Sequence, residues 1–215
     1  MTSRAVLFDF DGTFADTAPD LAAAVNAMRT RRGFAALAPE VVRPYASMGA
    51  RGLLRIGFDL TPEHRDYIAM RDEFLDNYAN AICVDTRLFP GMEELIAELD
   101  ARAIAWGIVT NKATRFTTCL VDELRVSPAC VVCGDTTAHL KPHPAPLLAA
   151  AEKLALAPAE CVYVGDDLRD IQAARAAGMR SVAVQYGYHG TDNPGPAAWN
   201  ADAIIDHPLE LLEHL

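Results

Sequence analysis

Long hydrophobic runs and blocks of basic residues are both absent from this sequence of 215 residues. Its longer apolar stretches, such as residues 104–109 (IAWGIV), fall far short of the roughly 20 residues that a membrane-spanning helix needs. The 29 acidic residues outnumber the 19 basic ones and give a net charge of −10, so the positive charge typical of nucleic-acid binders is missing. We therefore expect no membrane or nucleic-acid partner. An anionic substrate would need local positive charge from a metal ion or a well-placed lysine.

Cysteines are few and odd in number, and residues 1–12 carry no small-residue cleavage site of the kind that ends an export signal. These features predict a cytoplasmic protein with reduced thiols. The five cysteines are Cys83, Cys119, Cys130, Cys133 and Cys161.

A zinc site is suggested by the spacing of Cys130 and Cys133, which His139 and His143 follow. The two cysteines, however, lie in an apolar run that predicts a buried strand, where side chains three positions apart point to opposite faces. Lys141 also separates the two histidines. We therefore expect buried structural cysteines rather than a metal site.

Short apolar runs alternate with amphipathic segments along most of the chain, and 51% of its residues are hydrophobic, enough to bury a core. This alternation predicts an α/β fold in which helices flank a Rossmann-like parallel sheet. The predicted strands are residues 4–8, 104–109, 130–134, 161–165, 181–184 and 203–206. Residues 16–83 contain helical patterns without a convincing strand, so we predict a helical cap domain there, inserted into a core domain formed by residues 1–15 and 84–215.

Four polar elements follow predicted strands, and the carboxyl ends of parallel strands are where open sheets bind ligands. The elements are residues 9–17 (DFDGTFADT), residues 109–112 (VTNK), Lys141 in residues 140–144 (LKPHP), and residues 165–170 (GDDLRD). The hydroxyl of Thr110 and the backbone N–H groups around Asn111 are suited to holding phosphate oxygens. We therefore expect a phosphate site at this edge of the sheet.

In type, order and spacing, these four elements resemble the motifs of the haloacid dehalogenase superfamily. The resemblance implies that Asp9 is a nucleophile and a Mg²⁺ ligand. It implies that Asp11 is a general acid and base whose backbone carbonyl binds the metal, and that Asp166 completes the protein ligands. Lys141 would neutralise the phosphate, since a carboxylate can attack phosphorus only if the repulsion between the two is offset.

Other charged residues near these motifs have more open roles. Asp170 lies four residues beyond Asp166 and could return over one helical turn to a metal-bound water. Asp167 either takes part in the site or is only a charged residue at the start of a helix, and the sequence does not distinguish between the two. Lys112 is expected on the rim of the site. Arg51, in residues 47–51 (SMGAR) of the predicted cap, is a candidate for contacting the leaving group of the substrate.

The early helical insertion resembles the type 1 cap of the phosphoglycolate phosphatase group. The sequences VTNK and KPHPAPL strengthen the resemblance to that group. We therefore predict a Mg²⁺-dependent phosphomonoesterase that acts on a small phosphorylated metabolite through an aspartyl phosphate, with 2-phosphoglycolate as the expected substrate. Residues 165–171 and 186–212 also resemble bacterial N-acetylmuramic acid 6-phosphate phosphatases, and this second substrate stays open.

Three other functions fit the motifs less well. A sugar phosphomutase of the β-phosphoglucomutase type would share the fold and the aspartyl phosphate. It would differ in that a hydroxyl group, and not water, accepts the phosphoryl group. A dehalogenase is disfavoured because that branch does not need the second aspartate, Asp11. A non-catalytic protein is disfavoured because all four elements are intact. The sequence does not indicate an oligomeric state.

Overall fold

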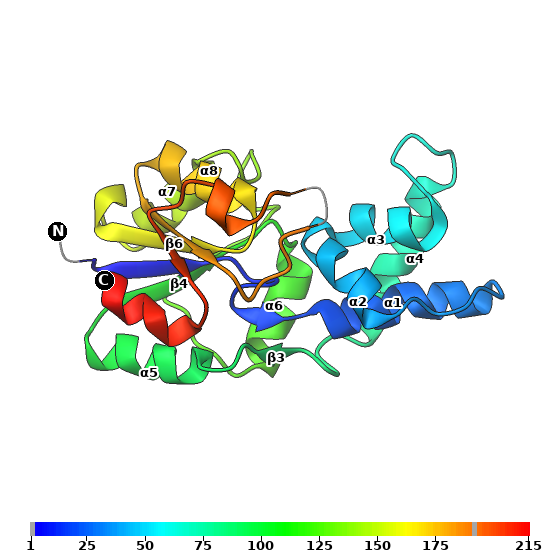
Figure 1. The fold of residues 1–215 in the computed structure, drawn as a ribbon, viewed down its shortest axis with the longest axis horizontal. Helices are drawn as coiled ribbons and strands as arrows, with labels where there is room; N and C mark the ends of the chain where they lie inside the picture. The colour runs from blue at the N-terminus through cyan, green and yellow to red at the C-terminus, as the bar shows by residue number, and fades with distance from the viewer. Residues whose placement is uncertain (1–2, 191–192) are drawn as a thin grey trace.

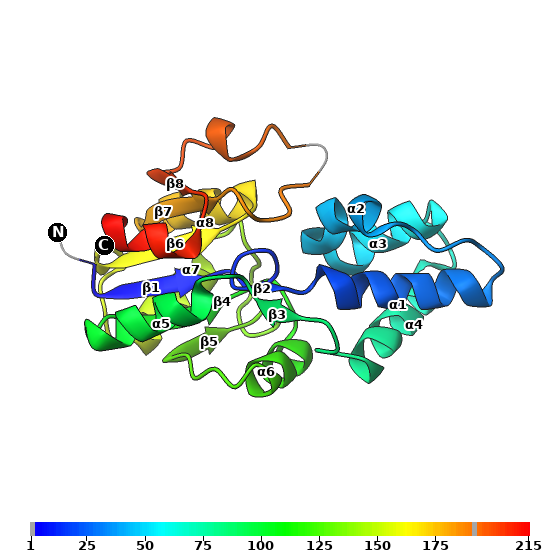
Figure 2. The ribbon, with the colours of Figure 1, turned by 60° about the horizontal axis from the view of Figure 1, so that its bottom comes forward.

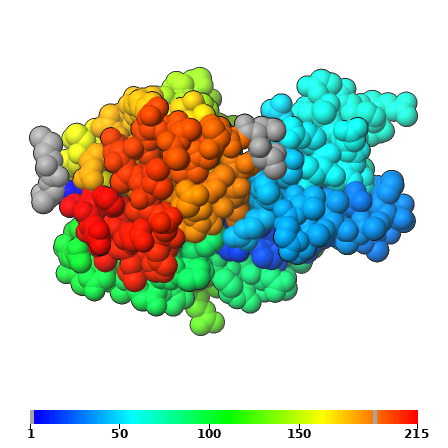
Figure 3. Space-filling view, in the orientation of Figure 1, coloured from blue at the N-terminus to red at the C-terminus, as the bar shows by residue number. Residues whose placement is uncertain are grey.

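The computed structural model describes residues 3–190 and 193–215. Residues 1–2 and 191–192, which fall within the predicted core segments, lie outside the described residues. Figure 1 shows a sheet covered by helices beside a helical lobe, and the space-filling view in Figure 3 shows that lobe, blue to cyan, projecting from the core. Within the described part of the chain, no helix is both long enough and apolar enough to cross a membrane.

The core is built on a six-stranded sheet in the order β5-β4-β1-β6-β7-β8, and every neighbouring pair is parallel. The strands are β1 (Ala5–Phe8), β4 (Ala105–Val109), β5 (Cys130–Val132), β6 (Cys161–Gly165), β7 (Arg180–Val184) and β8 (Ala203–Ile205). The predicted α/β fold with a parallel sheet is therefore confirmed. Cys130 and Cys133 are buried, as expected, and burial raises the pKa of the Cys130 thiol to about 11.

Helices bury both faces of the sheet, so alternate residues of β1 enter different hydrophobic clusters. Val6 and Phe8 pack with α5 (Met92–Ala101) and α6 (Thr114–Glu123). On the other face, the cluster around Ala5 and Leu7 includes α7 (Ala145–Lys153) and α8 (Leu168–Ala177). Four 3₁₀ helices complete the described chain: η1 (Arg43–Met48), η2 (Pro158–Glu160), η3 (Pro196–Ala198) and η4 (Pro208–His214).

The helical lobe is inserted between two short strands that pair antiparallel, β2 (Ala15–Asp16) and β3 (Arg87–Leu88). It contains α1 (Ala18–Arg31), α2 (Pro39–Val42), η1, α3 (Gly49–Phe58) and α4 (Tyr67–Asn80). Figure 2 shows the two connections side by side at β2 and β3. The predicted helical insertion is thus present, although the bounds 16–83 stay a prediction.

One buried carboxylate holds the two connections together. Asp20, near the start of α1, accepts hydrogen bonds from the backbone N–H groups of Asp85 (2.9 Å) and Thr86 (3.0 Å) and from the Thr86 hydroxyl (2.7 Å). Burying a carboxylate is costly unless donors replace its water, and these three donors do so. The outgoing helix is therefore tied to the returning strand.

A glycine in α3 allows this helix to pack closely against α1. A Cβ atom added at Gly57 would lie 2.8 Å from Cγ2 of Val25 on α1, inside the normal contact distance. Val25 is fully buried. Alanine is a better helix former than glycine by about 1 kcal/mol, so glycine at this position reflects packing and not helix propensity.

We predict that Gly57→Ala lowers the free energy of unfolding by about 1–3 kcal/mol, because an overpacked core shifts its backbone or leaves its rotamer minima. Urea unfolding followed by circular dichroism measures the change. In a Val25→Ala background the clash is removed, and Gly57→Ala should then be neutral or stabilising. An increase in stability from Gly57→Ala alone would contradict the packing argument.

Candidate active site

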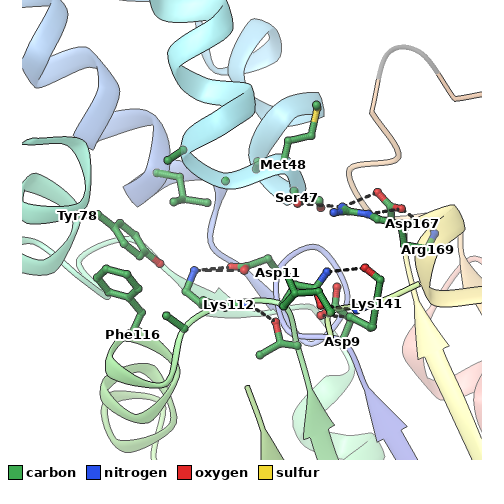
Figure 4. Close-up of a pocket in the computed structure, with 18 of the residues that line it drawn as sticks. Asp9, Asp11, Ser47, Met48, Tyr78, Lys112, Phe116, Lys141, Asp167 and Arg169 are labelled. Carbon is green, nitrogen blue, oxygen red and sulfur yellow. Dashed lines mark hydrogen bonds and ion pairs between the residues drawn. The ribbon is translucent and has the colours of Figure 1, made fainter. Parts of the chain in front are cut away.

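The carboxyl ends of three adjacent strands bring the predicted motifs together at one edge of the sheet. Asp9 follows β1, Thr110 follows β4, and Asp166 follows β6. Lys141 reaches the same point from the loop between β5 and α7. A cavity of about 370 Å³ lies between this edge and the helical insertion and is lined by residues from both (Figure 4).

At the base of the cavity, the ammonium group of Lys141 is held between two carboxylates. Its Nζ lies 2.8 Å from Oδ1 of Asp9 and 2.8 Å from Oδ1 of Asp170, and it donates a hydrogen bond to the Tyr163 hydroxyl at 2.7 Å. Burial alone would lower the pKa of Lys141, but the charges of Asp170 and Asp9 raise it above its ordinary value. The lysine is therefore a fixed positive charge beside Asp9.

Three buried carboxylates meet beside this lysine. One oxygen from each of Asp9, Asp166 and Asp170 lies within 4.8 Å of the others. Burial, followed by the negative charges of Asp9 and Asp170, raises the pKa of Asp166 well above its ordinary value. Burial likewise raises the pKa of Asp170 to about 6, against the attraction of Lys141. When the three carboxylates are ionised, their negative charge exceeds the single positive charge of Lys141.

This donor set fits a divalent cation. Its oxygens are the hard ligands that Mg²⁺ prefers. Oδ1 of Asp9 is buried, and its partner among the described residues is the Lys141 ammonium at 2.8 Å, so this oxygen keeps a lone pair for a cation. The carboxylate of Asp11 is not part of the cluster, so its predicted metal contact depends on its backbone carbonyl alone.

Asp166 is held in place by the surrounding loops. Its carboxylate accepts hydrogen bonds from the backbone N–H of Tyr188 (2.8 Å) and from the hydroxyls of Ser47 (3.2 Å) and Thr13 (3.3 Å). Gly12, at φ +85°, lies so close to this carboxylate that a Cβ atom there would overlap it. The glycine after Asp11 therefore permits both the turn and the contact.

Lys112 lies in the wall of the cavity and not on its rim, so the expected position was wrong. Its Nζ is 2.9 Å and 3.2 Å from the carboxylate oxygens of Asp11, and its side chain is only 8% exposed. Asp11 also accepts a hydrogen bond from the hydroxyl of Thr17 at 2.5 Å. The partly buried carboxylate of Asp11 is stabilised by a counter-charge, which explains why the lysine turns inward.

The two motif residues after β4 differ in their surroundings. Thr110 is buried, and its hydroxyl accepts a hydrogen bond from the backbone N–H of Lys112 (3.2 Å). The side-chain amide of Asn111 accepts from the N–H of Lys141 (2.9 Å) and donates to its carbonyl (3.0 Å). Asn111 therefore positions Lys141, and its predicted phosphate contact depends on its backbone N–H alone.

The start of α8 explains Asp167 and gives Asp170 a partner that was not expected. Asp167 is the N-cap of α8 and accepts hydrogen bonds from the backbone and the guanidinium of Arg169. Asp170 accepts from the N–H of Asp167 at 3.0 Å while it pairs with Lys141. Its predicted link to a metal-bound water stays untested.

The helical insertion contacts the site through residues that the sequence did not single out. The hydroxyl of Ser47 donates to Asp166, and the Ser47 carbonyl accepts a hydrogen bond from Arg169 at 3.1 Å. Arg51, the candidate in the same segment, is exposed and does not line the cavity. Because α3 buries Leu53 and Leu54, its first turn directs Arg51 toward solvent, and its predicted contact with the leaving group stays a prediction.

Comparison with known proteins agrees with this geometry. Residues 6–184 match the model of the haloacid dehalogenase-like hydrolase family. The chain is 44% identical over 214 residues to the N-acetylmuramic acid 6-phosphate phosphatase of Pseudomonas putida, covering 98% of this chain and 95% of that protein. It is also 44% identical over 213 residues to a phosphoglycolate phosphatase of Xanthomonas campestris pv. campestris, with the same coverage.

A solved structure of a predicted phosphoglycolate phosphatase from Haemophilus somnus 129PT superimposes with a TM-score of 0.83 at 27% identity. The superposition covers 100% of this chain and 98% of that one. The motifs, the parallel sheet and these matches lead to one conclusion: the chain belongs to the haloacid dehalogenase-like hydrolases.

Proposed function

We propose that this hydrolase is a Mg²⁺-dependent phosphomonoesterase in which Asp9 is the nucleophile. The observation that carries the proposal is the pairing of Asp9 with Lys141 beside the carboxylates of Asp166 and Asp170. Support comes from a carboxylate suited to be the nucleophile, a fixed cation and two carboxylates suited to bind a metal, which lie within a few ångströms of one another. Phosphoryl transfer to a carboxylate requires these three components.

Asp9, Asp166 and the backbone carbonyl of Asp11 would hold Mg²⁺, with Asp170 as the third carboxylate of the cluster. When bound, the cation offsets the repulsion between the carboxylate of Asp9 and the phosphate. Lys141 supplies a second positive charge from its fixed position. Thr110 and the N–H of Asn111 complete the proposed phosphate site.

In the first step, an oxygen of Asp9 forms a bond to phosphorus as the ester P–O bond breaks, and Asp11 gives its proton to the departing oxygen. In the second step, Asp11 takes a proton from water as that water attacks phosphorus, and the carboxylate of Asp9 is released. The hydrogen bonds from Lys112 and Thr17 orient Asp11 for both steps.

For the substrate, 2-phosphoglycolate remains the first proposal, supported by the phosphoglycolate phosphatases among the relatives. The volume of the cavity favours a second candidate. About 370 Å³ is far more than a two-carbon acid fills, and an N-acetylmuramic acid 6-phosphate would occupy more of it. The Pseudomonas putida relative supports this candidate too.

The unpaired cysteines support the proposed cytoplasmic location.

Lys141→Ala is expected to lower kcat/KM by about 100- to 1,000-fold, since it removes a preorganised charge from the transition state. Steady-state kinetics with Mg²⁺ and a phosphate ester measure the loss. The matched control is Lys153→Ala, an exposed lysine of α7 outside the cavity, which should leave kcat/KM near the wild-type value. Activity of Lys141→Ala within tenfold of wild type would refute the assigned role.

Mg²⁺ is expected to raise the melting temperature, and a chelator should reverse the shift and abolish turnover. The raised pKa values of Asp166 and Asp170 mean that their ionised forms cost stability near neutral pH, and a bound cation offsets that cost. As the pH falls through about 6, a proton on Asp170 competes with the cation, so the Mg²⁺-induced shift should shrink.

Two variants separate the cluster from its neighbour. Asp166→Asn should lose most of the Mg²⁺-induced thermal shift, whereas Asp167→Asn should keep it, because Asp167 lies outside the cluster and pairs with Arg169. Thermal unfolding with Mg²⁺ and with chelator gives the comparison. An equal shift in wild type and Asp166→Asn would place the metal elsewhere.

The substrate is identified by measuring kcat/KM for 2-phosphoglycolate and N-acetylmuramic acid 6-phosphate side by side, with Asp9→Asn as the inactive control. We expect one of them to be preferred by at least about 100-fold, since a cavity that pairs the polar groups of its substrate rejects a ligand that leaves them unpaired. Comparable weak rates on both would reject both substrates, and activity of Asp9→Asn would reject the mechanism.

A further inference from the structure

Part of the cavity wall carries polar groups that the proposed phosphate chemistry does not use. Figure 4 shows Tyr78 and Phe116 on one side of Lys112 and Asp9 on the other. Tyr78 comes from α4 of the helical insertion, and Phe116 comes from α6 of the core. Both line the cavity, as does Arg115, the neighbour of Phe116.

The hydroxyl of Tyr78 is a buried donor without a partner. Tyr78 is 1% exposed, and its oxygen makes no hydrogen bond within residues 3–190 and 193–215. The ammonium of Lys112 lies 4.7 Å from the centre of the Tyr78 ring, but an ammonium can only donate, so the proton of the hydroxyl has no acceptor among the described residues. Burial raises the pKa of Tyr78 to about 12, so the hydroxyl keeps its proton at neutral pH. Buried polar groups are normally paired, which points to a ligand group at this place.

Arg115 is the cation of the cavity wall that is not neutralised. Lys112, Lys141 and Arg169 also line the cavity, and each forms an ion pair with at least one aspartate. Arg115 forms no ion pair with any described residue, and its guanidinium lies 4.4 Å from the centre of the Phe116 ring. The positive charge at this position is therefore free to bind an anion.

These three side chains are contiguous. The rings of Tyr78 and Phe116 are 5.4 Å apart, centre to centre, and the guanidinium of Arg115 lies over the second ring. Phe116 is buried, and the exposed side chain of Arg115 lies against its ring, so the cation and the hydroxyl donor border the same part of the cavity wall. A planar guanidinium suits a carboxylate because its two parallel N–H groups match the two oxygens.

We infer that Arg115, Phe116 and Tyr78 form a subsite for the end of the substrate remote from its phosphate, with Arg115 binding a carboxylate and Tyr78 donating a hydrogen bond to a neighbouring oxygen. This inference rests on the proposed phosphatase function and narrows its substrates to esters that carry a second, carboxylate charge. Both candidate substrates meet this requirement: one is a phosphorylated hydroxy acid, and the other carries a lactyl carboxylate on its sugar.

The test compares each acid with a phosphate ester that lacks the carboxylate. 2-Phosphoglycolate is paired with 2-hydroxyethyl phosphate, and N-acetylmuramic acid 6-phosphate with N-acetylglucosamine 6-phosphate. In Arg115→Gln, the preference for the better acid over its neutral counterpart, as a ratio of kcat/KM, should fall by about 10- to 100-fold, mostly through KM. Tyr78→Phe should lower kcat/KM for the same acid. The loss of preference in the double variant should be smaller than the sum of the losses in the two single variants, expressed as free energies.

Arg125→Gln is the matched control, because Arg125 is an exposed arginine that does not line the cavity. It should keep the wild-type preference. An unchanged preference in Arg115→Gln, or an equal loss in Arg115→Gln and Arg125→Gln, would overturn the subsite.

Calorimetry keeps this result separate from the proposed function. Binding of each acid is measured to Asp9→Asn and to Asp9→Asn/Arg115→Gln, neither of which needs to turn over. A 10- to 100-fold loss of affinity for the tighter acid, the same range as above, supports the subsite, and equal affinities overturn it. Wild-type protein that hydrolyses none of the four esters would reject the proposed function, while the calorimetric comparison would still decide the subsite.

Discussion

The position of one buried ammonium group governs the candidate site. Lys141 lies between Asp9 and Asp170, and nearly every neighbouring feature serves to keep it there. Asn111 holds its backbone from both sides, and Tyr163 accepts a hydrogen bond from its Nζ. A lysine side chain has many rotamers, so holding it in one place costs conformational entropy that these contacts must offset.

The same contacts connect the lysine to the fold. The Tyr163 hydroxyl donates to the carbonyl of Val109 at 2.7 Å and thereby links β6 to the end of β4. Asp170 faces Lys141 because it lies in the first turn of α8, where one of its oxygens also accepts the N–H of the capping residue Asp167. Sheet, helix cap and active-site charge are therefore a single hydrogen-bonded unit. A change in any part of it would move the cation relative to Asp9.

The sequence predicted the parallel sheet, the helical insertion and the meeting of Asp9, Lys141 and Asp166, because Asp9 and Asp166 directly follow apolar runs that form strands and Lys141 lies in the loop after a third such run. It did not predict the contacts that depend on side-chain direction. Lys112 was expected on the rim, because a residue after a strand can turn inward or outward. In the structure the partly buried charge of Asp11 attracts its ammonium inward. The direction of Arg51 was not predicted for a related reason: the start of α3, which glycine and alanine mark only weakly, sets where that side chain points.

The helical insertion is coupled to the charge cluster through short polar contacts. Ser47 donates to Asp166 and accepts from Arg169, so one residue of the insertion touches both a candidate metal ligand and the capped end of α8. Asp16, in the first connection, pairs with Arg43 of the insertion and accepts from the Tyr188 hydroxyl, while the N–H of Tyr188 binds Asp166. Movement of the insertion would therefore exchange hydrogen bonds at Asp166 itself. Because burial raises the pKa of Asp166, the hydrogen bonds that Ser47 of the insertion and the N–H of Tyr188 donate to it help to stabilise its ionised form.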